Sequence, residues 1–174
     1  ETYLLACGCP IGAGIGLFDG MRISTDISES WTPEFMGVRN ILKNEETMPS
    51  AKYAIRNMLT RAHQHKKWWN NDPDCVQLRD KQKLTLAERQ SHITALALTG
   101  GSYIISDNLK KLSEENVNEG ARLLPLIDKR PVIVDLWQNE FPKLIKLPLS
   151  GAPGDWYLLA YFNWSDKKEK AFIK

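Results

Sequence analysis

The sequence lacks the patterns that mark several common protein classes. Its three cysteines, Cys7, Cys9 and Cys75, are odd in number and form no C-x-x-C pair, so neither a disulfide framework nor a zinc ribbon is predicted. No apolar run approaches the roughly 18 residues of a membrane-spanning helix, and no membrane partner is expected. The lysines and arginines are scattered and the net charge is +2, so we expect no basic surface for nucleic acid.

Motifs for nucleotides, metals and serine nucleophiles are missing as well. Residues 12–16 (GAGIG) follow a predicted strand, but the dinucleotide pattern G-x-G-x-x-G needs glycine where Leu17 stands. A loop between strands is preferred there, with nucleotide binding kept as a minor alternative. No G-x-S-x-G elbow occurs. His63 and His65 lie two positions apart on a predicted helix, where side chains diverge, so no metal site is predicted.

What the sequence does contain, in its first two thirds, is an alternation of strands and helices. Helices are predicted to begin after the N-cap residues Ser50, Thr85 and Ser113, the second ending at Gly100-Gly101 and the third near Leu124. Short strand-like runs precede and separate them, at residues 3–7, 20–25, 75–78 and 103–105. This order indicates parallel strands joined by crossover helices.

After Pro131 the pattern changes to short β-branched or aromatic runs separated by turn residues, at 131–137, 143–147, 156–163 and 170–173. Such runs favour antiparallel β structure, so a second domain is expected. We place the boundary between residues 1–128 and 129–174. Because Lys174 falls within or just after a predicted strand, the second domain is expected to be truncated.

Two segments carry candidate chemistry. Arg22 and Asp26, four apart near a strand end and followed by Trp31, could project to the rim where α/β enzymes keep their active sites, and an apolar setting would suit Asp26 to be a general acid. A surface ion pair beside a buried tryptophan explains the same residues. The segment 68–75 (WWNNDPDC) is by itself a turn. Sugar rings stack on indoles, but the default explanation of the six tryptophans is that they are core residues.

Together these segments resemble the α-galactosidases of glycoside hydrolase family 36 and their relatives in family 27. The matching elements occur in the family's order, closely over residues 1–125 and loosely after them. They are Cys7-Gly8-Cys9-Pro10, Asp19-Gly20-Met21-Arg22-Ile23-Ser24-Thr25-Asp26 with Trp31, Arg56-Asn57, Trp69-Asn70-Asn71-Asp72-Pro73-Asp74-Cys75 with Leu78-Arg79, and Ser106-Asp107-Asn108-Leu109.

The resemblance implies a fold and a site. The fold is the C-terminal half of a (β/α)8 TIM barrel, strands five to eight, followed by the start of an antiparallel β domain, since a whole barrel takes about 250 residues. Asp26 is implied to be the general acid/base, and Asp72 to be structural. Arg22 would contact the galactose 2-hydroxyl and hold Asp26, and Asp74 would brace Arg22. The implied substrate-binding residues are Cys7, Arg22, Asp74 and Cys75.

The resemblance also implies what the chain would need from outside. The family's nucleophile is an aspartate in a K-x-D motif on strand four, and no such motif precedes Cys7. The expected partners are an α-galactoside oligosaccharide and the missing N-terminal half of the barrel, with self-association possible, and no cofactor is expected. A galactosyl-transferring enzyme like raffinose synthase and a non-catalytic carbohydrate-binding or structural fragment remain alternatives. The cellular compartment is left open.

Overall fold

The computed structural model describes residues 2–34, 36, 44–127 and 129–171. Its first part holds parallel strands, as predicted. A three-stranded parallel sheet has the order β1 (Leu5–Ala6), β2 (Gly20–Arg22), β3 (Asn70–Asp72). A parallel pair follows, formed by β4 (Cys75–Val76) and β5 (Ile104–Ile105). Only two residues separate β3 from β4, so the chain passes directly from one sheet to the other.

The three α-helices begin where the capping residues predicted. Helix α1 (Ala51–Thr60) follows Ser50, which accepts a hydrogen bond from the Tyr53 amide, and α3 (Glu114–Ala121) follows Ser113. Helix α2 (Leu86–Thr99) begins with a full capping box between Thr85 and Glu88 and ends at Gly100, whose φ is 68°. Helix α3 ends three residues before the predicted Leu124. Short 3-10 helices cover Ile11–Gly14, Ala62–Gln64 and Leu109–Lys111.

The turn predicted for residues 68–75 is wrong at residues 70–72, because these polar residues form strand β3. Its register pairs Asn70 with Gly20 of β2 and Asp72 with Arg22 of β2. Asn71 is 1% exposed, yet its side chain accepts from the Trp69 indole at 3.0 Å and donates to the Arg61 carbonyl at 3.1 Å. These buried hydrogen bonds override the low strand propensity of asparagine.

The second part is antiparallel, as predicted. Strands β6 (Val132–Ile133), β7 (Leu144–Gly151) and β8 (Gly154–Tyr161) form one sheet in that order. The strand predicted at 170–173 is not found at residues 170 and 171, where the chain is irregular, and the rest of it lies outside the described residues. The Glu169 side chain instead binds Tyr161 and Lys143, which holds this segment to the sheet by side chains.

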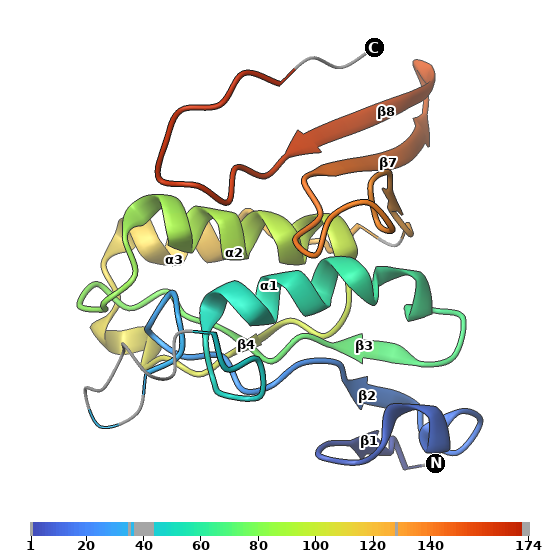
Figure 1. The fold of residues 1–174 in the computed structure, drawn as a ribbon, viewed down its shortest axis with the longest axis horizontal. Coiled ribbons are helices and arrows are strands. Elements are labelled where there is room, and N and C mark those ends of the chain that lie inside the picture. The colour runs from blue at the N-terminus through green and yellow to red at the C-terminus, as the bar shows by residue number, and fades with distance from the viewer. Residues whose placement is uncertain (1, 35, 37–43, 128, 172–174) are drawn as a thin grey trace.

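The helices lie between the two kinds of sheet. Figure 1 shows α1 and α2 with the parallel strands on one side and the β7–β8 hairpin on the other. One core joins these layers and includes Leu59 of α1, Val76 of β4, Leu96 of α2 and Leu147 of β7, all fully buried. Among the helices of the described residues, none is long and apolar enough to cross a membrane.

Buried His92 on α2 predicts a loss of stability in acid. The side chain is 1% exposed and its Nε2 has no hydrogen-bond partner among the described residues. Burial lowers the pKa of His92 from 6.5 to about 4, against a weaker opposing effect of the Asp74 charge. The unfolded chain therefore binds the extra proton first, and stability should fall as the pH drops from 6.5 through 4, by up to about 3 kcal/mol.

Urea unfolding between pH 7 and 4 measures this effect. His92→Leu should remove that part of the pH dependence, because no imidazole remains to be protonated on unfolding. An equally steep acid loss in His92→Leu would show that other groups cause it.

Candidate functional site

The candidate site begins where two neighbouring parallel strands end. Arg22 is the last residue of β2 and Asp72 the last of β3, and the register places them side by side. The Arg22 Nε lies 3.0 Å from Asp72 Oδ2, and the Asp72 side chain is fully buried. Because parallel strands bring their carboxyl ends to one edge, this ion pair fixes Arg22 at the rim of the sheet.

Asp26 lies in the loop after β2, within reach of the same guanidinium. Its Oδ1 is 3.0 Å from Arg22 Nη1, and its side chain is 73% exposed. The apolar, aromatic setting expected around this carboxyl is therefore not what the structure shows. Trp31 instead stacks against Trp164, with 6.1 Å between ring centroids, and packs on the core. The predicted Arg22–Asp26 pair is present, with Asp26 open to solvent.

Asp74 holds the arrangement together from a strained position. Its φ of 75° lies in the left-handed region, which costs a non-glycine residue about 1–3 kcal/mol. Its Oδ2 lies 3.2 Å from Arg22 Nη1 and accepts a hydrogen bond from the Ile27 amide at 2.9 Å. Its own amide donates to Asp72 Oδ1 at 2.9 Å. Asp74 thus connects both strand ends to the residue that follows Asp26.

One cation and three carboxylates make this cluster anionic. Burial acts to lower the pKa of Arg22, but the hydrogen bond to Asp72 and the charges of Asp72 and Asp74 outweigh it and raise that pKa. The guanidinium is therefore a permanent donor, and the carboxylates supply acceptors. Such a mixture suits a neutral polyhydroxylated ligand better than an anion.

The two predicted cysteines are placed differently. Cys7 follows β1, is exposed and lies near enough to Arg22 to influence its pKa. Cys75 instead packs against the cluster of Ile27, Ala54 and Leu84 behind the Asp26 loop. Burial is the largest cause raising the pKa of the Cys75 thiol. The structure therefore brings Cys7, Arg22, Asp26 and Asp74 to one rim, and the partly buried Cys75 thiol lies beside Asp74 and Ser106.

Sequence reasoning gave no role to a second ionic cluster beside the first. Arg79 donates to Asp107 at 2.6 Å and to Glu29 at 2.5 Å, and Glu29 lies in the Asp26 loop. Leu78-Arg79 and Ser106-Asp107 belong to the motifs of the family resemblance, which was the available signal. Glu29 carried no such signal, because its partner is 50 positions away.

Two other segments considered in the sequence analysis are the glycines at 12–16 and the histidines at 63 and 65. Residues 11–22 form a 3-10 turn followed by β2, so the glycines there do not lead into the helix N-terminus that a pyrophosphate needs. His63 contacts the edge of Trp68, and the described residues contain no group of three or more His, Cys, Asp or Glu side chains arranged so that it could hold a metal ion.

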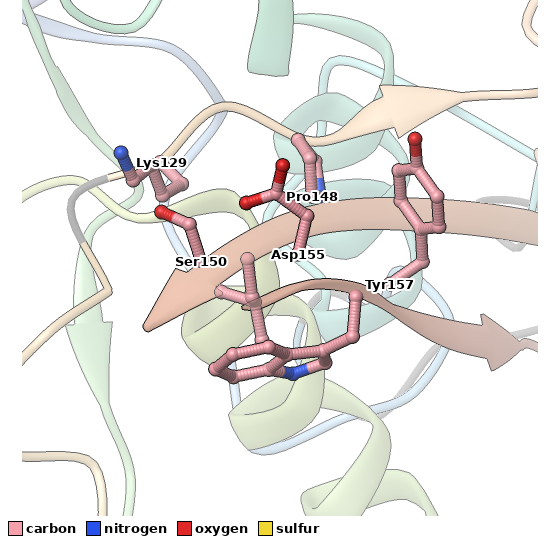
Figure 2. A pocket seen from close by; sticks show the side chains of 7 residues that line it. Lys129, Pro148, Ser150, Asp155 and Tyr157 are labelled. Carbon is pink, nitrogen blue, oxygen red and sulfur yellow. The ribbon is translucent and has the colours of Figure 1, made fainter. Parts of the chain in front are cut away.

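A separate cavity of about 270 Å³ lies on the antiparallel sheet. Figure 2 shows Ser150, Asp155 and Tyr157 projecting from the β7–β8 hairpin, with Lys129 beside them. This cavity contains none of the predicted site residues.

Several solved structures with a fold similar to that of this chain are α-galactosidases. An α-galactosidase from Thermus thermophilus in complex with p-nitrophenyl α-D-galactopyranoside matches 84% of this chain at 25% identity, with a TM-score of 0.62. The same enzyme in complex with stachyose matches 71% at 29% identity, with a TM-score of 0.57. An α-galactosidase from Saccharomyces cerevisiae matches 85% at 15% identity, with a TM-score of 0.57, a likeness of fold alone.

These matches show the fold of the chain and the share of each α-galactosidase that it spans. The chain has a mixed α/β fold like that of α-galactosidases, and it spans 28%, 26% and 36% of the three matched chains. No protein-family model matches it.

Proposed function

We propose that this chain is part of a retaining α-galactosidase of the family 36 type, in which Asp26 is the general acid/base. The observation that carries the proposal is the cluster at the ends of β2 and β3, where Arg22 joins Asp26, Asp72 and Asp74. The Thermus α-galactosidase matches at 25–29% identity support the same chemistry. The assignment of Asp26 comes from the family resemblance, in which the matching motifs occur in the family's order.

The proposed architecture is the second half of a barrel, residues 1–128, followed by the start of a β domain, residues 129–174. Strands β1, β2, β3–β4 and β5 would be barrel strands five to eight. The edge strand β1 supports this reading, because Tyr3, Leu4 and Leu5 around it are 57%, 49% and 44% exposed. We use "complete enzyme" for the protein in which the first barrel half covers that edge and supplies the nucleophile.

The proposed reaction is a double displacement with retention. Asp26 protonates the departing glycosidic oxygen while the nucleophilic aspartate, in the K-x-D motif of the other half, attacks the anomeric carbon. Asp26 then takes a proton from water, which releases α-galactose. This mechanism places the two carboxyl groups roughly 5 to 5.5 Å apart.

The structure suggests how Arg22 would serve this reaction. Its Nε binds Asp72 and its Nη1 binds Asp26 and Asp74. Nη2, which is unpaired among the described residues, would donate to the galactose 2-hydroxyl. Cys7, exposed at the same rim, would face that hydroxyl from β1.

The proposal predicts different activities for the chain alone and for the complete enzyme. Residues 1–174 alone should release no nitrophenol from p-nitrophenyl α-galactoside, because the nucleophile and half of the sugar site are absent. The complete enzyme should hydrolyse that substrate and leave p-nitrophenyl β-galactoside and α-glucoside almost untouched. Steady turnover by the isolated chain would contradict the half-barrel assignment, and a complete enzyme inactive on α-galactosides would contradict the function.

A further inference from the structure

The Asp26 carboxyl group, in the loop after β2, makes few contacts of its own. The Asp26 side chain is mostly exposed and its partner in the structure is Arg22. A general acid must reach the glycosidic oxygen within hydrogen-bond distance, so its position depends on the backbone of this loop. Contacts made by residues 27–31 therefore decide how well Asp26 is aimed.

Hydrogen bonds hold residues 27–31 at both ends, to Asp74 at the start and to helix α1 at the far end. Near its start, the Ile27 amide donates to Asp74 Oδ2 at 2.9 Å. At its far end, the Ser30 and Trp31 carbonyls accept from the Ala51 and Lys52 amides of α1, both at 3.0 Å. Between these points the Glu29 side chain reaches Arg79, which follows strand β4.

Glu29 is bound by a guanidinium that is itself fixed. Arg79 Nη1 donates to Glu29 Oε1 at 2.5 Å, and Arg79 Nε donates to Asp107 Oδ1 at 2.6 Å. The Asp107 side chain is 2% exposed, and its other oxygen accepts from the Leu78 amide, so it is immobilised at the end of β5. Arg79 and Glu29 are each about one third exposed.

We propose that Arg79 and Glu29 are positioning residues for acid/base catalysis, which tie the Asp26 loop to the ends of β4 and β5. The planar guanidinium connects two carboxylates in a fixed geometry, which a flexible lysine could not reproduce. Neither residue touches the reacting atoms. The inference rests on the proposed function for its catalytic meaning, whereas the anchoring of the loop stands on these contacts alone.

The cleaner variant is at Glu29, because removing it leaves the buried Asp107 paired with Arg79. In the complete enzyme, Glu29→Ala should lower kcat/KM for melibiose about tenfold, since a substrate with a poor leaving group needs a well-aimed proton donor. Activity on p-nitrophenyl α-galactoside should change less than twofold, because its leaving group needs little protonation. Glu29→Gln keeps the length and an acceptor oxygen, so its loss should be smaller, and it replaces the alanine variant if that one does not fold.

Glu169→Ala is the matched control, because it removes a similarly exposed ion pair with Lys143 away from the site. It should leave both activities unchanged. Equal losses on the two substrates in Glu29→Ala would indicate a merely structural role and overturn the proposal, as would no loss on either.

Hydrogen exchange of the peptide covering residues 26–31 gives a readout independent of activity. Glu29→Ala should speed its exchange severalfold, while Glu169→Ala should not. Unchanged exchange in Glu29→Ala would overturn the anchoring. If the unmodified complete enzyme hydrolyses no α-galactoside, the proposed function fails, and the exchange measurement alone decides whether the ion pair orders the loop.

Discussion

Asp26→Ala in the complete enzyme should lower kcat/KM for melibiose or raffinose by about 10²–10⁴-fold, the usual contribution of a general acid. These substrates have poor leaving groups, which depart slowly without a proton. p-Nitrophenyl α-galactoside should lose far less in its first step, because nitrophenolate leaves unassisted. Steady-state kinetics on both substrates measure the difference.

The second step should then limit turnover of the activated substrate. Without Asp26 no base activates water, so a galactosyl-enzyme should accumulate and nitrophenol should appear as a burst. Asp166→Ala, which removes an exposed carboxylate beyond the antiparallel sheet, is the control and should behave as the unmodified enzyme. Equal losses on the two kinds of substrate would remove Asp26 from the acid/base role.

Arg22→Lys should be the next most damaging change, although it keeps the charge. The guanidinium reaches Asp72 through Nε and both Asp26 and Asp74 through Nη1, and one ammonium cannot occupy both positions. Losing a charged hydrogen bond costs about 1.5–3 kcal/mol, so kcat/KM should fall about 10- to 150-fold on α-galactosides. Activity within twofold of the unmodified enzyme would move Arg22 out of the site.

The control for this prediction is Arg130→Lys, at an exposed position outside the cluster, which should change neither activity nor thermal unfolding. Unfolding also separates two causes of lost activity in Arg22→Lys. Because Asp72 is buried, a poorly placed ammonium would lower the midpoint of unfolding as well. An unchanged midpoint with lost activity would assign the effect to the substrate site.

Local signals in the sequence predicted the helices well. Ser50, Thr85 and Ser113 each cap the helix that follows, because a capping side chain acts within three residues of itself. The change from parallel to antiparallel strands near residue 131 was also predictable, since alternation and turn residues report on short stretches of chain. These features need no knowledge of distant contacts.

Features that depend on distant residues were not predictable in the same way. Strand β3 exists because Asn71 finds partners at Trp69 and Arg61 in a buried setting, against the propensity of asparagine. The positive φ of Asp74 is maintained by bonds to Asp72 and Ile27. Spacing along the chain contains no information on either.

For the site, the sequence indicated the Arg22–Asp26 pair because the two residues are four apart. It did not indicate the exposure of Asp26 or the partial burial of Cys75, both of which depend on how the loop after β2 packs on Leu84 and Trp31. The Arg79–Glu29 contact joins residues 50 positions apart and was equally beyond reach.

The central claim is that this chain contributes the acid/base, Asp26, and that the nucleophile comes from outside it. The stereochemistry of azide rescue tests this most directly. Azide needs no deprotonation, so in Asp26→Ala it should attack the β-linked galactosyl-enzyme from the opposite face and restore turnover of p-nitrophenyl α-galactoside. NMR of the product should then identify α-galactosyl azide. The β product would mean that azide displaced the aglycone directly, which would make Asp26 the nucleophile and contradict the account.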